Sequence, residues 1–152
     1  MHALQLIAPA LLAVLAAPAA LADPIAAHGE QEEMRRIDRQ EIARILAADN
    51  VDATRLPAID VAAAVRHIPR GEAPDDFWTA YQAHVRAWER SAAAEERLQR
   101  LAEGKPVPLE EIFTELLAAE AAVGETFDAV RRIAEAYGVP MPTPPAEAAE
   151  TI

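Results

Sequence analysis

The sequence predicts an all-α fold: a four-helix bundle-like domain with two shorter helices and a long antiparallel helical hairpin, placed after an N-terminal signal peptide. Apolar residues recur at steps of three and four, which is the spacing of one helix face. No stretch alternates apolar and polar residues as a half-buried strand does. Proline and glycine gather at a few points and separate the periodic stretches. The 152 residues fit one domain.

The first 22 residues have the pattern of a secretory signal. Residues 3–22 are apolar except for Gln5, and Pro18 breaks the helix just before Ala20-Leu21-Ala22. The small first and third residues of that triplet are typical of a cleavage site, so we expect cleavage after Ala22. Met1-His2 lacks the usual positive charge. An uncleaved anchor is the alternative, but the run is alanine-rich and barely reaches a spanning length. We therefore expect a periplasmic or secreted protein with no stable membrane span after cleavage.

The mature chain is expected to begin with a short leader, residues 23–29, and to continue as a helical domain over residues 30–140. The first helix is predicted from about Glu30 to Ala48. Its apolar stripe consists of Met34, Ile37, Ile42, Ile45 and Leu46. Pro57 can start a second helix, because its missing N–H is not needed in the first turn. Pro69 ends that helix by forcing the residue before it out of helical geometry.

A third helix is predicted to begin with Asp75 or Asp76 as its N-cap, where a carboxylate favours the positive end of the helix. It runs to about Glu103, and Gly104 is expected as the C-terminal cap. The apolar stripe of this helix consists of Phe77, Tyr81, His84, Trp88, Ala92, Leu98 and Leu101. The short connector 105–108 makes the third and fourth helices antiparallel neighbours.

The fourth helix has the strongest periodic signal in the chain. Its near-heptad stripe consists of Leu109, Phe113, Leu116, Glu120, Val123, Phe127, Val130, Ala134 and Tyr137. Gly124 lies inside this helix, and we expect the close approach of another helix to explain it. Gly138 followed by Pro140 ends the helix. Residues 141–152 are rich in proline, alanine and glutamate, which predicts a disordered tail.

Composition excludes several classes of protein. The absence of cysteine removes disulfides, thiol nucleophiles, zinc fingers and covalent haem attachment. Twenty-five acidic residues against 14 basic ones give a net charge of −11, which repels phosphate backbones, so we expect no nucleic-acid partner. An acidic surface of this kind favours solubility or cationic partners.

Catalytic and cofactor motifs are also missing from the sequence. The single serine, Ser91, lies within a predicted helix, and the single lysine, Lys105, lies in a proline-flanked connector. No histidine has a glutamate three positions before it, as di-iron bundles require, and no phosphate-binding loop is present. We therefore expect no cofactor and no resident metal, and the sequence favours a non-catalytic protein over an enzyme.

One segment concentrates polar and aromatic side chains that could form a site. On the third helix, Tyr81, His84 and Trp88 share a face, and Trp78 points about 100° away from it. Asp60, on the second helix, could pair with Arg86 or Arg90 across helices. A carboxylate, an imidazole and aromatic rings converging would form a ligand- or partner-binding site. The simpler interpretation is structural, since Trp and His often lie at the edge of a core with their polar tips satisfied.

The favoured hypothesis from these observations is a non-catalytic interaction or structural protein of the cell envelope. Its partner would be a protein of unknown identity that docks on a helix face, and a homo-oligomer is also compatible with the amphipathic hairpin. The alternative is a bundle that binds a small ligand or a metal around His84 and Trp88. An enzyme would need an acid–base pair such as His84 with Asp60.

Overall fold

The computed structural model describes residues 24–106 and 108–143. The expected signal peptide, with its cleavage position, and residues 144–152 of the expected tail lie outside the described residues.

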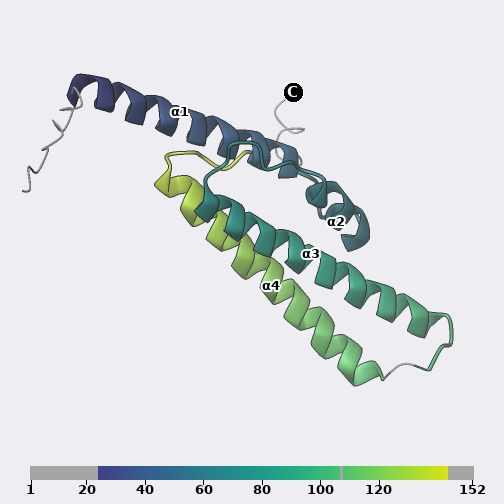
Figure 1. The fold of residues 1–152 in the computed structure, drawn as a ribbon. Coiled ribbons are helices and arrows are strands. Elements are labelled where there is room, and N and C mark those ends of the chain that lie inside the picture. Colours follow the sequence, from purple (N-terminus) through teal and green to yellow (C-terminus); the bar gives the residue numbers. More distant parts are fainter. Residues whose placement is uncertain (1–23, 107, 144–152) are drawn as a thin grey trace, which may run out of the picture.

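Four helices make up the described residues, and no strand occurs among them: α1 (Pro24–Asp49), α2 (Ala58–Arg66), α3 (Asp75–Ala102) and α4 (Leu109–Ala136). The predicted all-α fold is confirmed. Helices α3 and α4 lie side by side as a long antiparallel hairpin, and α2 packs against α3. Helix α1 crosses near the end of the hairpin that holds the start of α3 and the end of α4 (Figure 1). The connector between α3 and α4 lies at the opposite end.

Proline occupies the N-cap of three helices, at Pro57, Pro74 and Pro108, and none of these caps has a side-chain hydrogen bond. The prediction that Asp75 or Asp76 caps α3 is therefore wrong, because both residues lie inside its first turn. Their carboxylates still favour the positive end of the helix from there. The proline fixes an extended backbone directly before the helix, so it sets the start without a capping side chain.

Helix α1 begins at Pro24, earlier than the expected start near Glu30, so the described part of the expected leader is helical. A proline is well tolerated in the first turn. Residues 28–36 are exposed, and Met34 is 60% exposed, so its predicted place on the core stripe is wrong. This half of α1 extends beyond the other described helices (Figure 1), in keeping with the exposure of residues 28–36.

The main core lies where the second half of α1 meets α2, the start of α3 and the end of α4. Phe77 and Tyr81 are its largest fully buried side chains, and their rings stack with centroids 6.3 Å apart. The aliphatic members are Ile42, Ile45, Leu46, Val61, Val65, Val85, Val130 and Val139. Because this core lies at one end of the hairpin, α3 and α4 are the only described helices at the other end (Figure 1).

The core-facing stripe of α4 differs from the predicted one. Buried and half-buried residues follow the four-three spacing through Ile112, Leu116, Ala119, Val123, Thr126, Val130, Ile133 and Tyr137. Leu109, Phe113, Glu120 and Phe127, all predicted on the stripe, are exposed. The two stripes share Leu116, Val123, Val130 and Tyr137, and between these the smaller Ala119 and Thr126 lie against α3.

The C-terminal ends of α3 and α4 follow the predicted glycine rule. Gly104 and Gly138 have φ angles of 78° and 77°, a left-handed conformation that closes a helix at little cost only for glycine. The predicted domain ends at residue 140, but residues 141–143 still contact the rest of the fold. Met141 is half-buried against the core, and Asn50 Nδ2 donates to the Thr143 carbonyl at 2.9 Å. The packed region therefore extends to residue 143.

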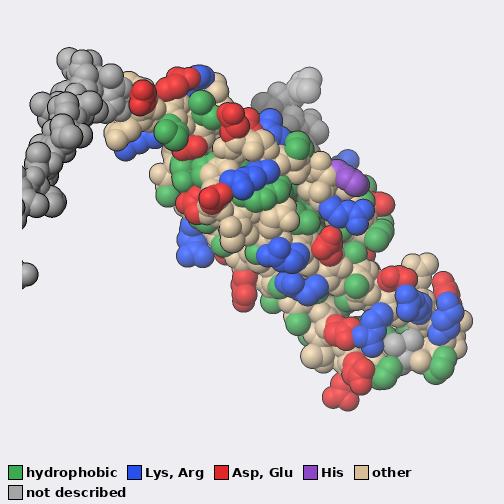
Figure 2. Space-filling view, in the orientation of Figure 1, with side chains coloured by type: hydrophobic (Ala, Val, Ile, Leu, Met, Phe, Trp, Pro, Cys, Tyr) green, Lys and Arg blue, Asp and Glu red, His purple; other side chains and the backbone are tan. Residues whose placement is uncertain are grey.

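Acidic and basic side chains are mixed over the face of the molecule that Figure 2 shows. Figure 2 shows acidic and basic side chains interleaved over the far end of the hairpin, where Arg97 pairs with Glu115 and Lys105 with Glu103. Among the described helices, none is both long and apolar enough to cross a membrane.

Candidate functional site

A cleft of about 600 Å³ lies between the end of α1, the connector 50–57, α3 and α4. Its walls are mainly apolar, and its ionisable side chains are those of Asp49, Asp52, His84 and Arg131. The remaining lining residues are Leu46, Asn50, Val51, Ala53, Thr54, Val61, Trp88, Val123, Gly124, Phe127, Met141 and Pro142. A largely apolar cleft with a few polar groups is the general form of a small-molecule site.

His84 is the buried polar side chain at the centre of this region, with 3% of its surface exposed. Its Nε2 accepts a hydrogen bond from Trp88 Nε1 at 3.1 Å. Its Nδ1 lies 3.1 Å from the hydroxyl of Thr126 on α4. That hydroxyl donates to the Ala122 carbonyl at 2.6 Å, so it has a lone pair left for an N–H of the imidazole.

These contacts fix both the tautomer and the charge of His84. The indole N–H of Trp88 can only donate, so Nε2 carries no proton and Nδ1–H donates to Thr126. Burial lowers the pKa of His84 to about 4, so the imidazole is neutral near neutral pH. The predicted i,i+4 contact of His84 and Trp88 is present, with the rings edge to face at 6.2 Å.

Asp49 is the second buried polar group and closes the cleft next to His84. It is the last residue of α1, and its side chain is only 8% exposed. The Tyr81 hydroxyl lies 3.3 Å from Asp49 Oδ1 and 3.4 Å from the Val65 carbonyl. His84 Nε2 lies 4.0 Å from Asp49 Oδ2. Burial raises the pKa of the Asp49 carboxyl to about 7.

No cation of the described residues pairs with Asp49. Its neighbours are a phenol and a neutral imidazole. The other charged groups of the cleft are already compensated, since Asp52 binds Arg55 at 3.0 Å and Arg131 binds Asp128 at 2.7 Å. Burying a carboxylate without a cation costs free energy of folding. Asp49 is therefore stable in this position either as the protonated acid or with a positive group bound to it.

The structure brings three of the five sequence-predicted site residues together. His84 and Trp88 line the cleft, and Tyr81 lies beneath it with its hydroxyl on Asp49. Trp78 packs on Tyr81 with centroids 5.6 Å apart, at the edge of the core and outside the cleft. Asp60 is exposed in the first turn of α2, with no ion pair to Arg86 or Arg90 in the described structure.

Sequence reasoning missed Asp49 and misread Gly124. Asp49 carried one signal: it is a carboxylate at the negative end of a helix whose last turn holds no basic residue. Gly124 was expected to admit a neighbouring helix, but a Cβ built there meets nothing within 4 Å. Gly124 instead lines the cleft, so the missing side chain leaves space for an occupant.

A metal site is not supported by the donor groups. Within the described residues, no cluster of three or more His, Asp or Glu side chains has metal-binding geometry. The Nε2 lone pair of His84 is already used by Trp88.

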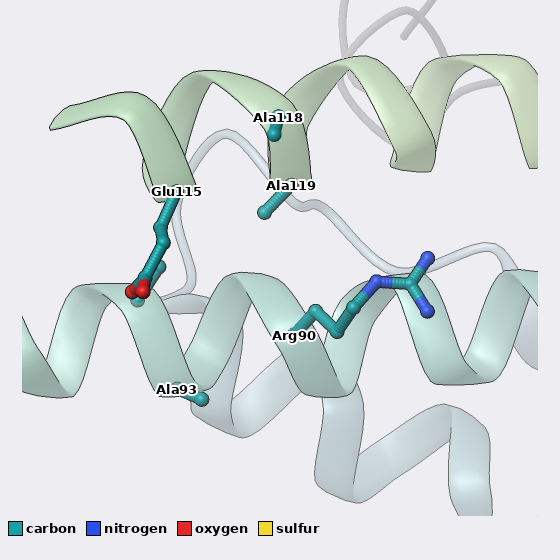
Figure 3. A pocket seen from close by; sticks show the side chains of 6 residues that line it. Arg90, Ala93, Glu115, Ala118 and Ala119 are labelled. Atoms are coloured by element: carbon teal, nitrogen blue, oxygen red, sulfur yellow. The ribbon is translucent and has the colours of Figure 1, made fainter. Parts of the chain in front are cut away.

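A second, smaller cavity of about 300 Å³ lies between α3 and α4, farther along the hairpin. Figure 3 shows the side chains of Ala93, Ala118 and Ala119 around it, with Glu115 reaching from α4 toward α3 and Arg90 extending away along α3. Glu115 is paired with Arg97. The cavity is a gap left by small methyl groups, and it presents no buried polar group to a ligand.

Comparison of the chain with protein-family models, with curated proteins and with solved structures gave no match in any of the three.

Proposed function

We propose that this protein binds a small, mainly apolar organic molecule in the cleft between α1, α3 and α4, without chemical conversion. The observation that carries the proposal is the combination of a cleft of about 600 Å³ with the buried His84 at its wall, whose two ring nitrogens are hydrogen-bonded to the half-buried Trp88 and Thr126. Such a network holds the aromatic wall of a site rigid before a ligand arrives, which reduces the entropic cost of binding.

Binding is favoured over catalysis by the state of His84 and by the position of Asp60. His84 has both ring nitrogens engaged and its pKa lowered by burial, so it is poorly placed to exchange protons near neutral pH. Asp60, the acid–base partner considered from the sequence, lies on the surface of α2.

The test is a titration with the uncharged fluorescent probe N-phenyl-1-naphthylamine, whose emission rises in apolar surroundings. We expect saturable binding at one site per chain. Gly124→Leu places a side chain in the cleft and should weaken binding at least about tenfold, because it removes space that the probe occupies. Ala121→Leu, exposed on the same helix and outside the cleft, is the matched control and should bind as the wild type does.

Two outcomes would overturn the proposal. One is the absence of saturable binding by the wild-type protein. The other is equal binding by Gly124→Leu and the wild type, which would place the probe on an exposed apolar surface instead of in the cleft.

A second candidate function, protein interaction, is favoured by a different observation. Leu109, Phe113 and Leu117 are exposed at four-residue spacing on one side of α4, at 51%, 49% and 65%. The exposed carboxylates of Glu110 and Glu120 lie beside them. An apolar stripe flanked by acids is complementary to a partner helix with an apolar face and basic flanks.

That second candidate is tested with a labelled synthetic helix that has leucine on one face and lysine on its flanks. Fluorescence anisotropy should show that Leu117→Ser, which removes the most exposed side chain of this stripe, weakens binding about tenfold. Met34→Ser, which removes an equally exposed side chain on α1, should change nothing. Equal effects of both substitutions would mean that the peptide recognises the acidic surface in general.

We propose further that the protein acts in the cell envelope or outside the cell, as the signal-like residues 1–22 suggest. The intact mass of protein recovered from its own cells tests this. A chain starting at Asp23 is expected, and a mature chain that keeps residues 1–22 would overturn it.

A further inference from the structure

We infer that the ligand of the cleft is an organic amine, a molecule with an apolar body and one ammonium group that binds the carboxylate of Asp49. This inference depends on the proposed function, since it names the class of molecule that fills the same cleft. It starts from the fact that the side chain of Asp49 is more than nine-tenths buried and faces the cleft without a cationic partner.

The titratable and charged groups around Asp49 come from three elements, and none of these groups forms an ion pair with its carboxylate. On α3, Tyr81 and His84 present a phenol and a neutral imidazole. In the connector, Asp52 is bound by Thr54 and Arg55. On α4, Arg131 is held by Asp128 at 2.7 Å. No lysine or arginine of the described residues pairs with Asp49, and a ligand ammonium would supply a positive partner for its carboxylate.

The walls beside Asp49 suit the rest of such a molecule. Trp88 and Phe127 line the cleft, with the His84 ring 5.8 Å from that of Phe127. Aromatic faces attract organic cations in addition to burying apolar surface. An anionic ligand is disfavoured, because it would bring a second negative charge to Asp49.

Proton linkage follows from the same geometry. Below its pKa of about 7, the Asp49 carboxyl holds a proton, which must leave to solvent when an ammonium binds the carboxylate. The affinity for an amine should therefore fall about thirtyfold between about pH 8 and about pH 5.5, where the pH lies about 1.5 units below that pKa. An uncharged ligand of the same shape should show no such fall.

The experiment compares three probes of one shape: 2-phenylethylamine, 2-phenylethanol and phenylacetate. Binding is followed by the emission of Trp88 in a Trp78→Phe background, which leaves a single tryptophan in the chain. At about pH 8 the amine should bind at least about tenfold more tightly than the alcohol, because a hydrogen bond to a charged group adds that much. Phenylacetate should bind most weakly.

Asp49→Asn should reduce the preference of amine over alcohol to less than about threefold while the alcohol still binds, which also shows that the variant is folded. Asp60→Asn, an exposed carboxylate on α2, should keep the full preference.

The outcomes separate this inference from the proposed function. If the alcohol binds as tightly as the amine and Gly124→Leu abolishes both, the cleft binds apolar molecules and the amine inference fails alone. Tighter binding of phenylacetate would also overturn the amine inference, since it would make Arg131 the charged partner. If none of the three probes, nor the uncharged dye, binds, both fail.

Discussion

Replacing Asp49 by asparagine should change how the stability of this protein depends on pH. In the wild type two buried groups act in opposite directions. The carboxyl of Asp49 has its pKa raised by burial from 3.8 to about 7, and the imidazole of His84 has its pKa lowered by burial from 6.5 to about 4. Asparagine keeps the shape of the side chain and removes only the titrating group.

The sign of each effect follows from proton binding. Between pH 3.8 and about 7 the folded state holds the Asp49 proton and the unfolded state does not, so stability falls as pH rises through that window. Between about pH 4 and 6.5 the unfolded state protonates His84 and the folded state does not, so stability increases as pH rises.

The magnitudes follow at about 1.4 kcal/mol per pH unit. From about pH 5 to about pH 7.5, the titration of Asp49 lowers the free energy of unfolding by about 3 kcal/mol. The titration of His84 raises it by about 2 kcal/mol over the same range. The wild type should therefore lose only about 1 kcal/mol over this range. The free energy of unfolding of Asp49→Asn should rise by about 2 kcal/mol over the same pH range, because only His84 then titrates.

Urea unfolding followed by tryptophan fluorescence measures these free energies directly. Asp52→Asn is the control, because the Thr54 hydroxyl bonded to Asp52 holds the pKa of that carboxyl below its usual range, outside this window. The nitrogen-15 NMR shifts of the His84 ring at about pH 6 provide a second readout. They should show one protonated and one bare nitrogen.

Two results would refute this reasoning. Parallel pH profiles for the wild type and Asp49→Asn would mean that Asp49 is not held neutral in the fold. An imidazolium spectrum for His84 at about pH 6 would mean that His84 and Asp49 form an ion pair, with the proton on His84.

Three further substitutions test the packing around the cleft by urea or thermal unfolding. Thr126→Val removes the acceptor of His84 Nδ1–H and should cost about 1–3 kcal/mol, whereas Thr126→Ser should cost less; equal losses would argue against the hydrogen bond. Gly124→Ala should stabilise the protein by about 1 kcal/mol, because the added methyl meets nothing; a lower Tm would show a hidden clash. Phe77→Ala, at a fully buried position, should cost about 3–5 kcal/mol, and Phe113→Ala, at a half-exposed one, under about 1 kcal/mol; similar costs would contradict the core described here.

The helices and their hairpin could be predicted because periodicity and proline or glycine punctuation are local signals. Gly104 and Gly138 end their helices as expected for that reason. The face of α4 could not be chosen in the same way. Leu109 and Phe113 are larger than Ala119 and Thr126, so they dominated the pattern, but the smaller pair faces α3. Which stripe is buried depends on the partner helix, and that information is not local.

In the candidate site, too, contacts within one helix could be predicted and contacts between distant segments could not. His84 and Trp88 were found because they lie one turn apart on one helix. Asp49 lies 32 residues before its partner Tyr81, and it becomes buried only when α3 packs across the end of α1. Asp60 has the same carboxyl group but lies on the outer side of α2. Carboxyl groups that look equivalent in a sequence are separated only by long-range packing.

The segment after α4 has a consequence for proteolysis. Met141 and Pro142 form part of the cleft wall, and the Asn50–Thr143 hydrogen bond holds them in place. A cut after Pro140 would remove that wall and leave the helical hydrogen bonds intact. A bound molecule that touches Met141 would keep this segment docked, so occupancy should slow cleavage there, and the rate of nicking becomes a measure of ligand binding that needs no fluorescent reporter.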